Sequence, residues 1–162
     1  MRRLFVGSRG GIAGTVYGTI VVMAALAAGS QDEVDPWRLG AIASATVLVL
    51  WIAHVYSHAL AETIRANRRL DREEFFDVAR RESAIPFAAV GPLAALVLGG
   101  LGVLGERASL RIALGIGAAT LAVQGLGYAR TIHASRLATI VSVAVNLSLG
   151  LVIVALEVAL AH

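Results

Sequence analysis

Two histidines and one glutamate recur at every fourth position, at His54, His58 and Glu62, near the end of an apolar stretch. On an α-helix, residues four positions apart lie about 40° apart around the axis, so the three side chains share one face. Imidazole binds zinc, iron, nickel and copper, and it also exchanges protons near neutral pH. The spacing therefore predicts either a divalent transition-metal site or a proton relay, and it does not separate the two.

A structural role explains the same residues without any chemistry. His54 would bond a neighbouring helix, His58 would reach interfacial water, and Glu62 would pair with an arginine. Catalysis has less support, because a His-Glu-x-x-His motif is absent and four histidines are too few for a membrane di-iron oxygenase. We therefore predict no catalytic residue, although a metal-dependent enzyme at the inner leaflet stays an alternative.

Further polar side chains lie in two other apolar segments. Asn146 and Glu157 fall about 20° apart on one stripe of the last segment, which also carries Ser142. Tyr17 in the first segment lies at about the same depth as His54, roughly 8 to 9 Å from the same membrane face. These positions predict a path for a proton or small cation from the histidines past Asn146 to Glu157, with Tyr17 beside it. Helix-to-helix bonding by Asn146 is the structural alternative.

The elements that hold these residues must be membrane helices. The chain has 162 residues, 57% of them hydrophobic, and a mean hydropathy of +0.77, which is too apolar for one small soluble core. A bilayer core about 30 Å thick needs about 20 apolar residues in a helix. Five segments approach that length, and they predict an all-α polytopic protein with a single integral membrane domain over residues 1–162. Their ranges are 12–28, 39–60, 85–104, 112–128 and 137–161.

Arginine positions predict the orientation of these spans, because short cytoplasmic loops collect positive charge. With the N-terminus inside and the C-terminus outside, only Arg38, Arg107 and Arg111 face outward. The arginines on the cytoplasmic side are then Arg2, Arg3, Arg9, Arg65, Arg68, Arg69, Arg72, Arg80, Arg81, Arg130 and Arg136. We expect a multi-pass protein of a bacterial cytoplasmic membrane.

Composition also excludes several functions. The chain has no cysteine, so disulfides and thiolate chemistry are excluded. Its net charge is only +3, and its arginines lie at the ends of the predicted helices, as membrane topology requires. We therefore predict no nucleic-acid partner.

A long polar segment, residues 62–82, lies between the second and third spans. Asp71 is followed three residues later by Glu74, a capping-box spacing that predicts the start of a short amphipathic helix on the cytoplasmic side. We expect this helix to lie along the inner membrane surface. Its apolar face would consist of Phe75, Phe76, Val78 and Ala79.

Small residues at four-residue spacing, Gly14 with Gly18 and Ala95 with Gly99, predict close helix packing. The fourth span is short and rich in glycine, so a re-entrant or broken helix is an alternative to a complete span there. The expected contacts of the chain are bilayer lipid and either a second copy of itself or a membrane partner protein.

Two stretches resemble those of small uncharacterised integral membrane proteins of actinobacteria, VYGTI at residues 16–20 and WIAHVYSHAL at residues 51–60. This resemblance implies no activity. In topology the chain is also similar to vacuolar-type iron transporters, which have five spans and an acidic helical insert between the second and third. That similarity implies metal transport, but the insert is far shorter here, and the first span has Met23 and no carboxylate.

The residues thus favour a small transporter or channel for a proton or small cation. A membrane subunit or scaffold without catalytic activity, binding a partner through glycine-rich helix faces or the amphipathic helix, is the main alternative. The metal-dependent enzyme is the third. A bound divalent metal at His54, His58 and Glu62 is predicted by the third, and by the first only where the transported cation is a metal.

Overall fold

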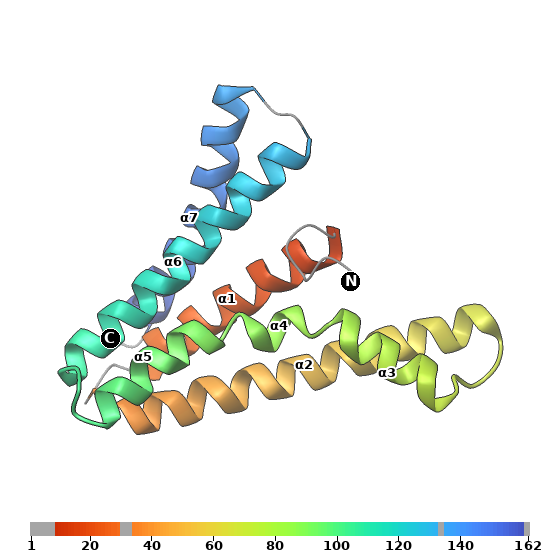
Figure 1. Cartoon of the computed structure of the whole chain (residues 1–162), viewed down its shortest axis with the longest axis horizontal. Helices are drawn as coiled ribbons and strands as arrows, with labels where there is room; N and C mark the ends of the chain where they lie inside the picture. The colour runs from red at the N-terminus through yellow and green to blue at the C-terminus, as the bar shows by residue number, and fades with distance from the viewer. Residues whose placement is uncertain (1–8, 30–33, 133–134, 161–162) are drawn as a thin grey trace.

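The computed structural model describes residues 9–29, 34–132 and 135–160, and every regular element among them is a helix (Figure 1). The helices follow one another through short connections and fan out from one end of the molecule. They are α1 (Arg9–Gly29), α2 (Pro36–Ala66), α3 (Arg72–Arg81), α4 (Ala84–Phe87), α5 (Val90–Gly100), α6 (Glu106–Thr131) and α7 (Arg136–Leu160).

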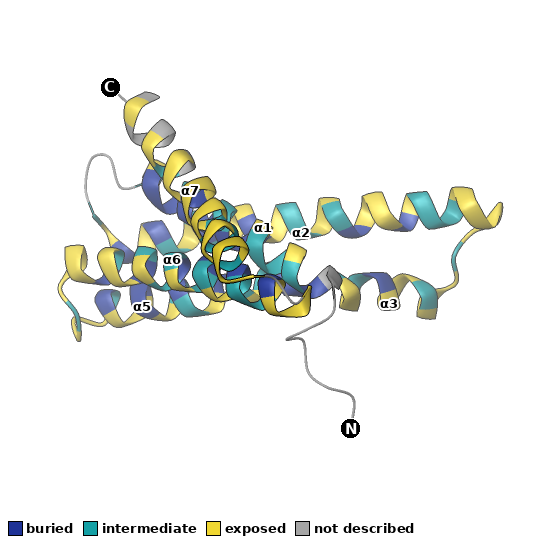
Figure 2. Ribbon diagram, turned by 90° about the horizontal axis from the view of Figure 1, so that it is seen from above, coloured by how far each residue is buried: buried dark blue, intermediate teal, exposed yellow. Residues whose placement is uncertain are grey.

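Among the described residues, three helices are long and apolar enough to cross a membrane: Gly11–Gly29 of α1, all of α2 and all of α6. Their outward faces carry large apolar side chains, and Figure 2 shows exposed positions along most of the outer helix surfaces. Ile52, for example, is 59% exposed. Apolar side chains at such positions fit contact with lipid. The expected all-helical membrane class is therefore supported.

The uninterrupted helix predicted for residues 85–104 is wrong. The chain forms the four-residue α4 and then α5, and the segments Arg72–Phe87 and Val90–Gly100 are bent by 49° relative to each other. Pro92 lies just after the break and has no N–H to donate to the carbonyl four residues earlier, which disfavours a continuous helix. Counting this bent pair as one span raises the number of candidate spans from three to four.

The fourth predicted span is continuous, although its glycines suggested a break. It forms α6, which has 26 residues and begins before and ends after the predicted range 112–128. Two of its glycines lie under neighbouring helices, with Gly117 next to Met23 and Gly125 next to the backbone of Val143. Glycine here allows close packing and does not interrupt the helix.

The last predicted span corresponds to α7, but the structure tests it only in part. Its apolar stretch of described side chains, Arg136–Val152, is shorter than a complete span. The five predicted spans therefore correspond to three long helices, one broken helix and one helix whose full span is not established.

The predicted amphipathic helix exists, and its capping box is confirmed. Asp71 accepts a hydrogen bond from the backbone N–H of Glu74 at 2.9 Å, and Glu74 accepts one from the backbone N–H of Asp71 at 3.0 Å. Its expected position along the inner membrane surface stays a prediction. After the left-handed Asn67, α3 runs back beside the end of α2, and Val78 is buried between them (Figures 1 and 2).

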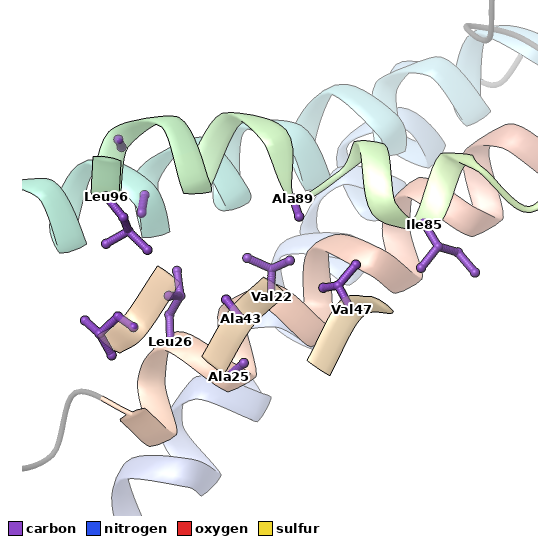
Figure 3. Packing of buried hydrophobic residues seen from close by; sticks show 11 residues of the cluster. Val22, Ala25, Leu26, Ala43, Val47, Ile85, Ala89 and Leu96 are labelled. Carbon is purple, nitrogen blue, oxygen red and sulfur yellow. The ribbon is translucent and has the colours of Figure 1, made fainter. Parts of the chain in front are cut away.

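The core lies where α1, α2, α4 and α5 meet (Figure 3). Val22 and Leu26 of α1 face Val47 of α2, Ile85 of α4 and Leu96 of α5, and all five side chains are nearly inaccessible to solvent. The predicted packing residues lie around this core. Burial of the broken segment thus holds α4 against α1, and it keeps the end of α3 beside α2, where the polar residues gather.

Candidate proton path

His58 forms a close contact with a glutamate that the sequence pattern did not indicate. Its Nδ1 lies 2.7 Å from Oε1 of Glu82, the residue that ends α3. The His58 side chain is 53% exposed, whereas that of Glu82 is 19% exposed. This pair can pass a proton between an imidazole and a carboxylate, with one partner open to water.

Two ring contacts extend from this pair towards α1. The ring of His54 meets that of His58 edge to face, with 5.9 Å between their centroids. On its other side, His54 stacks against Tyr17 at 5.0 Å in a tilted arrangement. Glu82, His58, His54 and Tyr17 therefore form a row of proton-bearing side chains from three parts of the chain, which we call the histidine row.

Glu62 lies outside the histidine row. It accepts a hydrogen bond from Nη2 of Arg81 at 2.9 Å, which is the arginine pairing that the structural alternative predicts. Within the part of the chain that the structure describes, no group of three or more histidine and acidic side chains is placed to hold a metal ion. The metal site at His54, His58 and Glu62 stays a prediction without geometric support.

Tyr17 also lines an open cleft of about 680 Å³ between α1, α6 and α7, which we call the inner cavity. Asn146 of α7, the next residue in the predicted path, lies in the same cavity wall. Asn146 donates to the carbonyl of Ser142 at 2.9 Å, and Ser142 donates to the carbonyl of Gly125 at 3.1 Å. The wall is formed by Ile12, Ala13, Val16, Tyr17, Ile20, Gln124, Tyr128, Ile132, Ala138, Val141, Ser142, Val145 and Asn146.

The rest of the predicted path is less defined. Glu157 belongs to α7, but its side chain lies outside the described residues, as does all of His133, which the sequence places in the loop between α6 and α7. The structure therefore brings together Tyr17, His54 and His58, places Asn146 across the inner cavity from α1, and leaves the connection to Glu157 as a prediction.

The predicted packing residues lie at close helix contacts. A Cβ on Gly18 would lie 2.5 Å from the carbonyl oxygen of Ile85, and one on Gly14 would lie 3.1 Å from the Cβ of Ala84. Ala95 is buried, and a Cβ on Gly99 would overlap the side chain of Ser109. The contacts of Gly14 and Gly18 place the break between α4 and α5 directly against α1.

The tip of the α2 and α3 pair is held by a separate ion pair. Arg68 donates to both carboxylate oxygens of Glu74. These hydrogen bonds, together with the one from the backbone of Asp71, lower the pKa of Glu74 to about 2. This pair orders the turn between α2 and α3 and lies away from the histidine row.

No protein-family model, curated protein or solved structure matches this chain. The class is therefore defined by the fold and the site alone. The part of the chain that the structure describes is all-helical, with three candidate membrane spans and the histidine row where the end of α3 lies beside α2.

Proposed function

We propose that this protein conducts or exchanges protons across a bacterial cytoplasmic membrane. The observation that carries the proposal is the histidine row, in which Glu82, His58, His54 and Tyr17 follow one another at contact distance. Histidine can gain and lose a proton near neutral pH, so adjacent imidazoles suit a relay. A proton is favoured over a small metal cation because none of the described residues in the inner cavity wall carries a carboxylate.

The proposed topology has five spans, with the N-terminus in the cytoplasm and the C-terminus outside. The broken α4 and α5 would form the third span, and α7 would form the fifth. The clustering of arginines at one set of helix ends supports this orientation. Protons would then enter from the cytoplasm at the exposed His58 and pass His54 and Tyr17 into the inner cavity.

Beyond Tyr17, the proposed path crosses the inner cavity to Asn146 and continues to Glu157. The cavity exceeds the space that one water molecule needs, and water there would complete the path. Asn146 itself would orient water, since an amide does not titrate in this range. Conduction would therefore depend on proton transfer along the histidine row and on hydration of the cavity.

Proton flux into liposomes tests the proposal. The purified protein would be reconstituted with a pH-sensitive dye inside the vesicles, and a potassium diffusion potential would drive proton entry. His58→Gln can keep a hydrogen bond to Glu82 but cannot carry a proton, so we expect it to reduce the flux by about 100-fold, the lower end of what a positioned acid or base contributes.

Glu62→Gln is the matched control for this experiment. It removes a carboxylate from the same helix face, but one that pairs with Arg81 outside the histidine row. We expect it to keep the parent flux. Equal flux in the parent and His58→Gln, with both proteins folded by circular dichroism, would refute the relay. Loss of flux in Glu62→Gln with bound metal in the parent would restore the metal-site interpretation.

A second candidate function, a subunit that docks a partner protein, is favoured by one observation. At 31 residues, α2 is about 46 Å long and exceeds a hydrocarbon core of about 30 Å. Its end and α3 would therefore project from the membrane, with Ile64 71% exposed and Phe75 and Phe76 about half exposed. Gly14, Gly18 and Gly99 already contact other helices of the same chain, so this projection is the better partner surface.

The two candidates differ in what they need from each region. Phe75→Ser/Phe76→Ser should leave proton flux unchanged and should abolish the cellular phenotype only if a partner docks there. His58→Gln should reduce proton flux, and it should abolish the cellular phenotype only if proton conduction is the function. A phenotype that survives both variants would exclude both functions.

A further inference from the structure

The break between α4 and α5 leaves backbone groups without partners (Figure 1). Among the described residues, no hydrogen bond reaches the carbonyl oxygen of Ala88. The donor that a continuous helix would supply belongs to Pro92, four residues later, and proline has no N–H. The backbone N–H of Gly91 also has no partner in this part of the chain. Because unpaired backbone groups are costly in a bilayer, a break at membrane depth is tolerated where it lines a polar space.

An open pocket of about 190 Å³ lies at this break, between α1, α5 and α6. Ala88, Gly91 and Pro92 form one side of it. Thr15 of α1 and Thr120 of α6 carry the polar side chains of its described wall. We call this space the break pocket, and its remaining wall residues are Phe87 and Ile116. The break pocket therefore combines two hydroxyls with a stretch of backbone that has an unpaired carbonyl.

Both hydroxyl oxygens can act as acceptors in this pocket. Thr15 donates to the carbonyl of Gly11, and Thr120 donates to the carbonyl of Ile116, each at 2.8 Å. Because each hydroxyl hydrogen is engaged within its own helix, the lone pairs of the two oxygens are what these side chains can offer to a ligand. With the carbonyl of Ala88, the break pocket has three neutral oxygen acceptors and no charged side chain in its described wall.

We propose that the break pocket binds one alkali metal cation, sodium or potassium, through the carbonyl oxygen of Ala88 and the hydroxyl oxygens of Thr15 and Thr120. Carbonyl oxygens replace the hydration shell of such ions in membrane proteins, and broken membrane helices supply them. Calcium and magnesium sites use carboxylates, which the described wall lacks, so a monovalent ion is favoured. The N–H of Gly91 would donate to a water molecule that completes the coordination.

The inner cavity differs from the break pocket in its backbone. Apart from Ile132, its wall residues belong to the continuous helices α1, α6 and α7, in which backbone carbonyls accept hydrogen bonds along the helix. An unpaired carbonyl is therefore specific to the break. The break pocket suits a cation that has lost part of its water, whereas the inner cavity suits the proton path.

The proposed function includes proton exchange, and a cation held in the break pocket would be the ion exchanged for protons. This consequence rests on the proposed function. The break pocket and the histidine row share α1, where a Cβ on Gly18, the residue after Tyr17, would lie 3.1 Å from the Cβ of Ala88. The binding site itself does not depend on the proton path.

Equilibrium binding of radioactive sodium to the detergent-solubilised full chain tests the site. We expect saturable binding of a single ion, which unlabelled potassium displaces and choline at equal ionic strength does not. Radioactive rubidium, as an analogue of potassium, would show which of the two ions binds more tightly. Absence of saturable binding of both ions would overturn the proposal and leave water in the pocket. Equal displacement by calcium would overturn the assignment to a monovalent ion.

Two threonine variants locate the site. Thr15→Val and Thr120→Val each remove one oxygen and keep the shape of the side chain. We expect each to weaken binding by at least about tenfold, the smaller loss that follows removal of a group supporting a metal ligand. Thr46→Val is the matched control, because Thr46 donates to the carbonyl of Ile42 at 2.8 Å but lies outside the break pocket. Parent affinity in both pocket variants would refute the proposal.

Pro92→Ala tests the backbone ligand separately. Alanine supplies an N–H that can donate to the carbonyl of Ala88, so we expect binding to weaken by a similar factor. Circular dichroism and thermal unfolding in choline chloride would show that each variant is folded. An unchanged affinity in Pro92→Ala would exclude the carbonyl of Ala88 as a ligand and overturn the proposed coordination.

A gradient of the bound cation separates this proposal from the proposed function. In liposomes without a membrane potential, the cation inside and choline outside should drive proton entry through the parent but not through Thr15→Val/Thr120→Val. If the parent binds the cation but passes no protons under either driving force, the cation site stands and the proton path fails. If protons pass under a membrane potential and no alkali cation binds, the reverse holds. If both are present but the gradient drives no protons, the site stands and the exchange is refuted.

Discussion

The α2 and α3 pair and the α6 and α7 pair are both antiparallel helix pairs, but they are held together differently. Polar side-chain contacts link α3 to α2, namely the ion pair of Arg81 with Glu62 and the contact of His58 with Glu82. Between α6 and α7 the contacts are a glycine against backbone and neutral hydrogen bonds such as Ser142 to Gly125. The α2 and α3 pair suits contact with water and proton exchange. The α6 and α7 pair suits contact with lipid, where a glycine allows the two backbones to approach closely.

The largest predicted effect tests Tyr17, the residue that joins the two regions. Tyr17→Phe keeps the ring contact with His54 but removes the hydroxyl that would transfer a proton into the inner cavity. We expect proton flux to fall by at least about 100-fold, measured in the liposome assay.

Tyr128→Phe is its control, because Tyr128 also lines the inner cavity but has no ring contact with a histidine in the described residues. Its flux should match that of the parent. Equal losses in both variants would mean that cavity polarity, and not the histidine row, limits the flux.

A glycine pair tests the packing of α6 on α7. A Cβ on Gly125 would lie 2.9 Å from the Cα of Val143, whereas one on Gly127 would meet nothing within 4 Å. We expect Gly125→Val to destabilise the protein by about 1 to 3 kcal/mol through overpacking. Thermal unfolding in detergent measures this difference, and Gly127→Val should lie much closer to the parent. Equal melting temperatures for both variants would contradict the close packing.

The attachment of α3 to α2 should also depend on one buried valine. Val78 is 1% exposed, so Val78→Ala should loosen α3 and cost about 1 kcal/mol, near the effect of removing buried methyl groups. Amide hydrogen exchange along α3 would show the change. The exposed Phe75 provides the control, since Phe75→Ala should leave protection of the α3 amides nearly unchanged, and faster exchange in this variant would show that α3 is held by its outer face.

The smallest effect concerns the turn between α2 and α3. The pKa of Glu74 is lowered to about 2 from 4.5, so its contribution to order is complete above about pH 4.5 and is lost as the pH falls towards 2. Hydrogen exchange at the start of α3 should therefore be slower in the parent than in Glu74→Gln at neutral pH. This difference in exchange rate should disappear near pH 2. If it persists there, a contact other than the Glu74 ion pair slows the exchange.

Some of the candidate site follows from local spacing, and some does not. His54 and His58 are neighbours because one helix turn separates them, and the capping box of Asp71 and Glu74 is equally local. Glu82 was missed as the partner of His58 because 24 residues separate them and only the return of α3 along α2 brings them together. The sequence pattern grouped Glu62 with the two histidines because its spacing fits. In the structure the carboxylate of Glu62 instead forms an ion pair with Arg81 on α3.

By itself, the sequence determined the helical membrane class, the long apolar segments and the start of α3, since these depend on hydrophobic length and on hydrogen bonds within a few residues. Only the tertiary structure decided where the third segment breaks, how α3 folds onto α2, and which side chains meet Tyr17. Those features depend on contacts between helices distant in sequence, and helical periodicity specifies a face but not the neighbour that covers it.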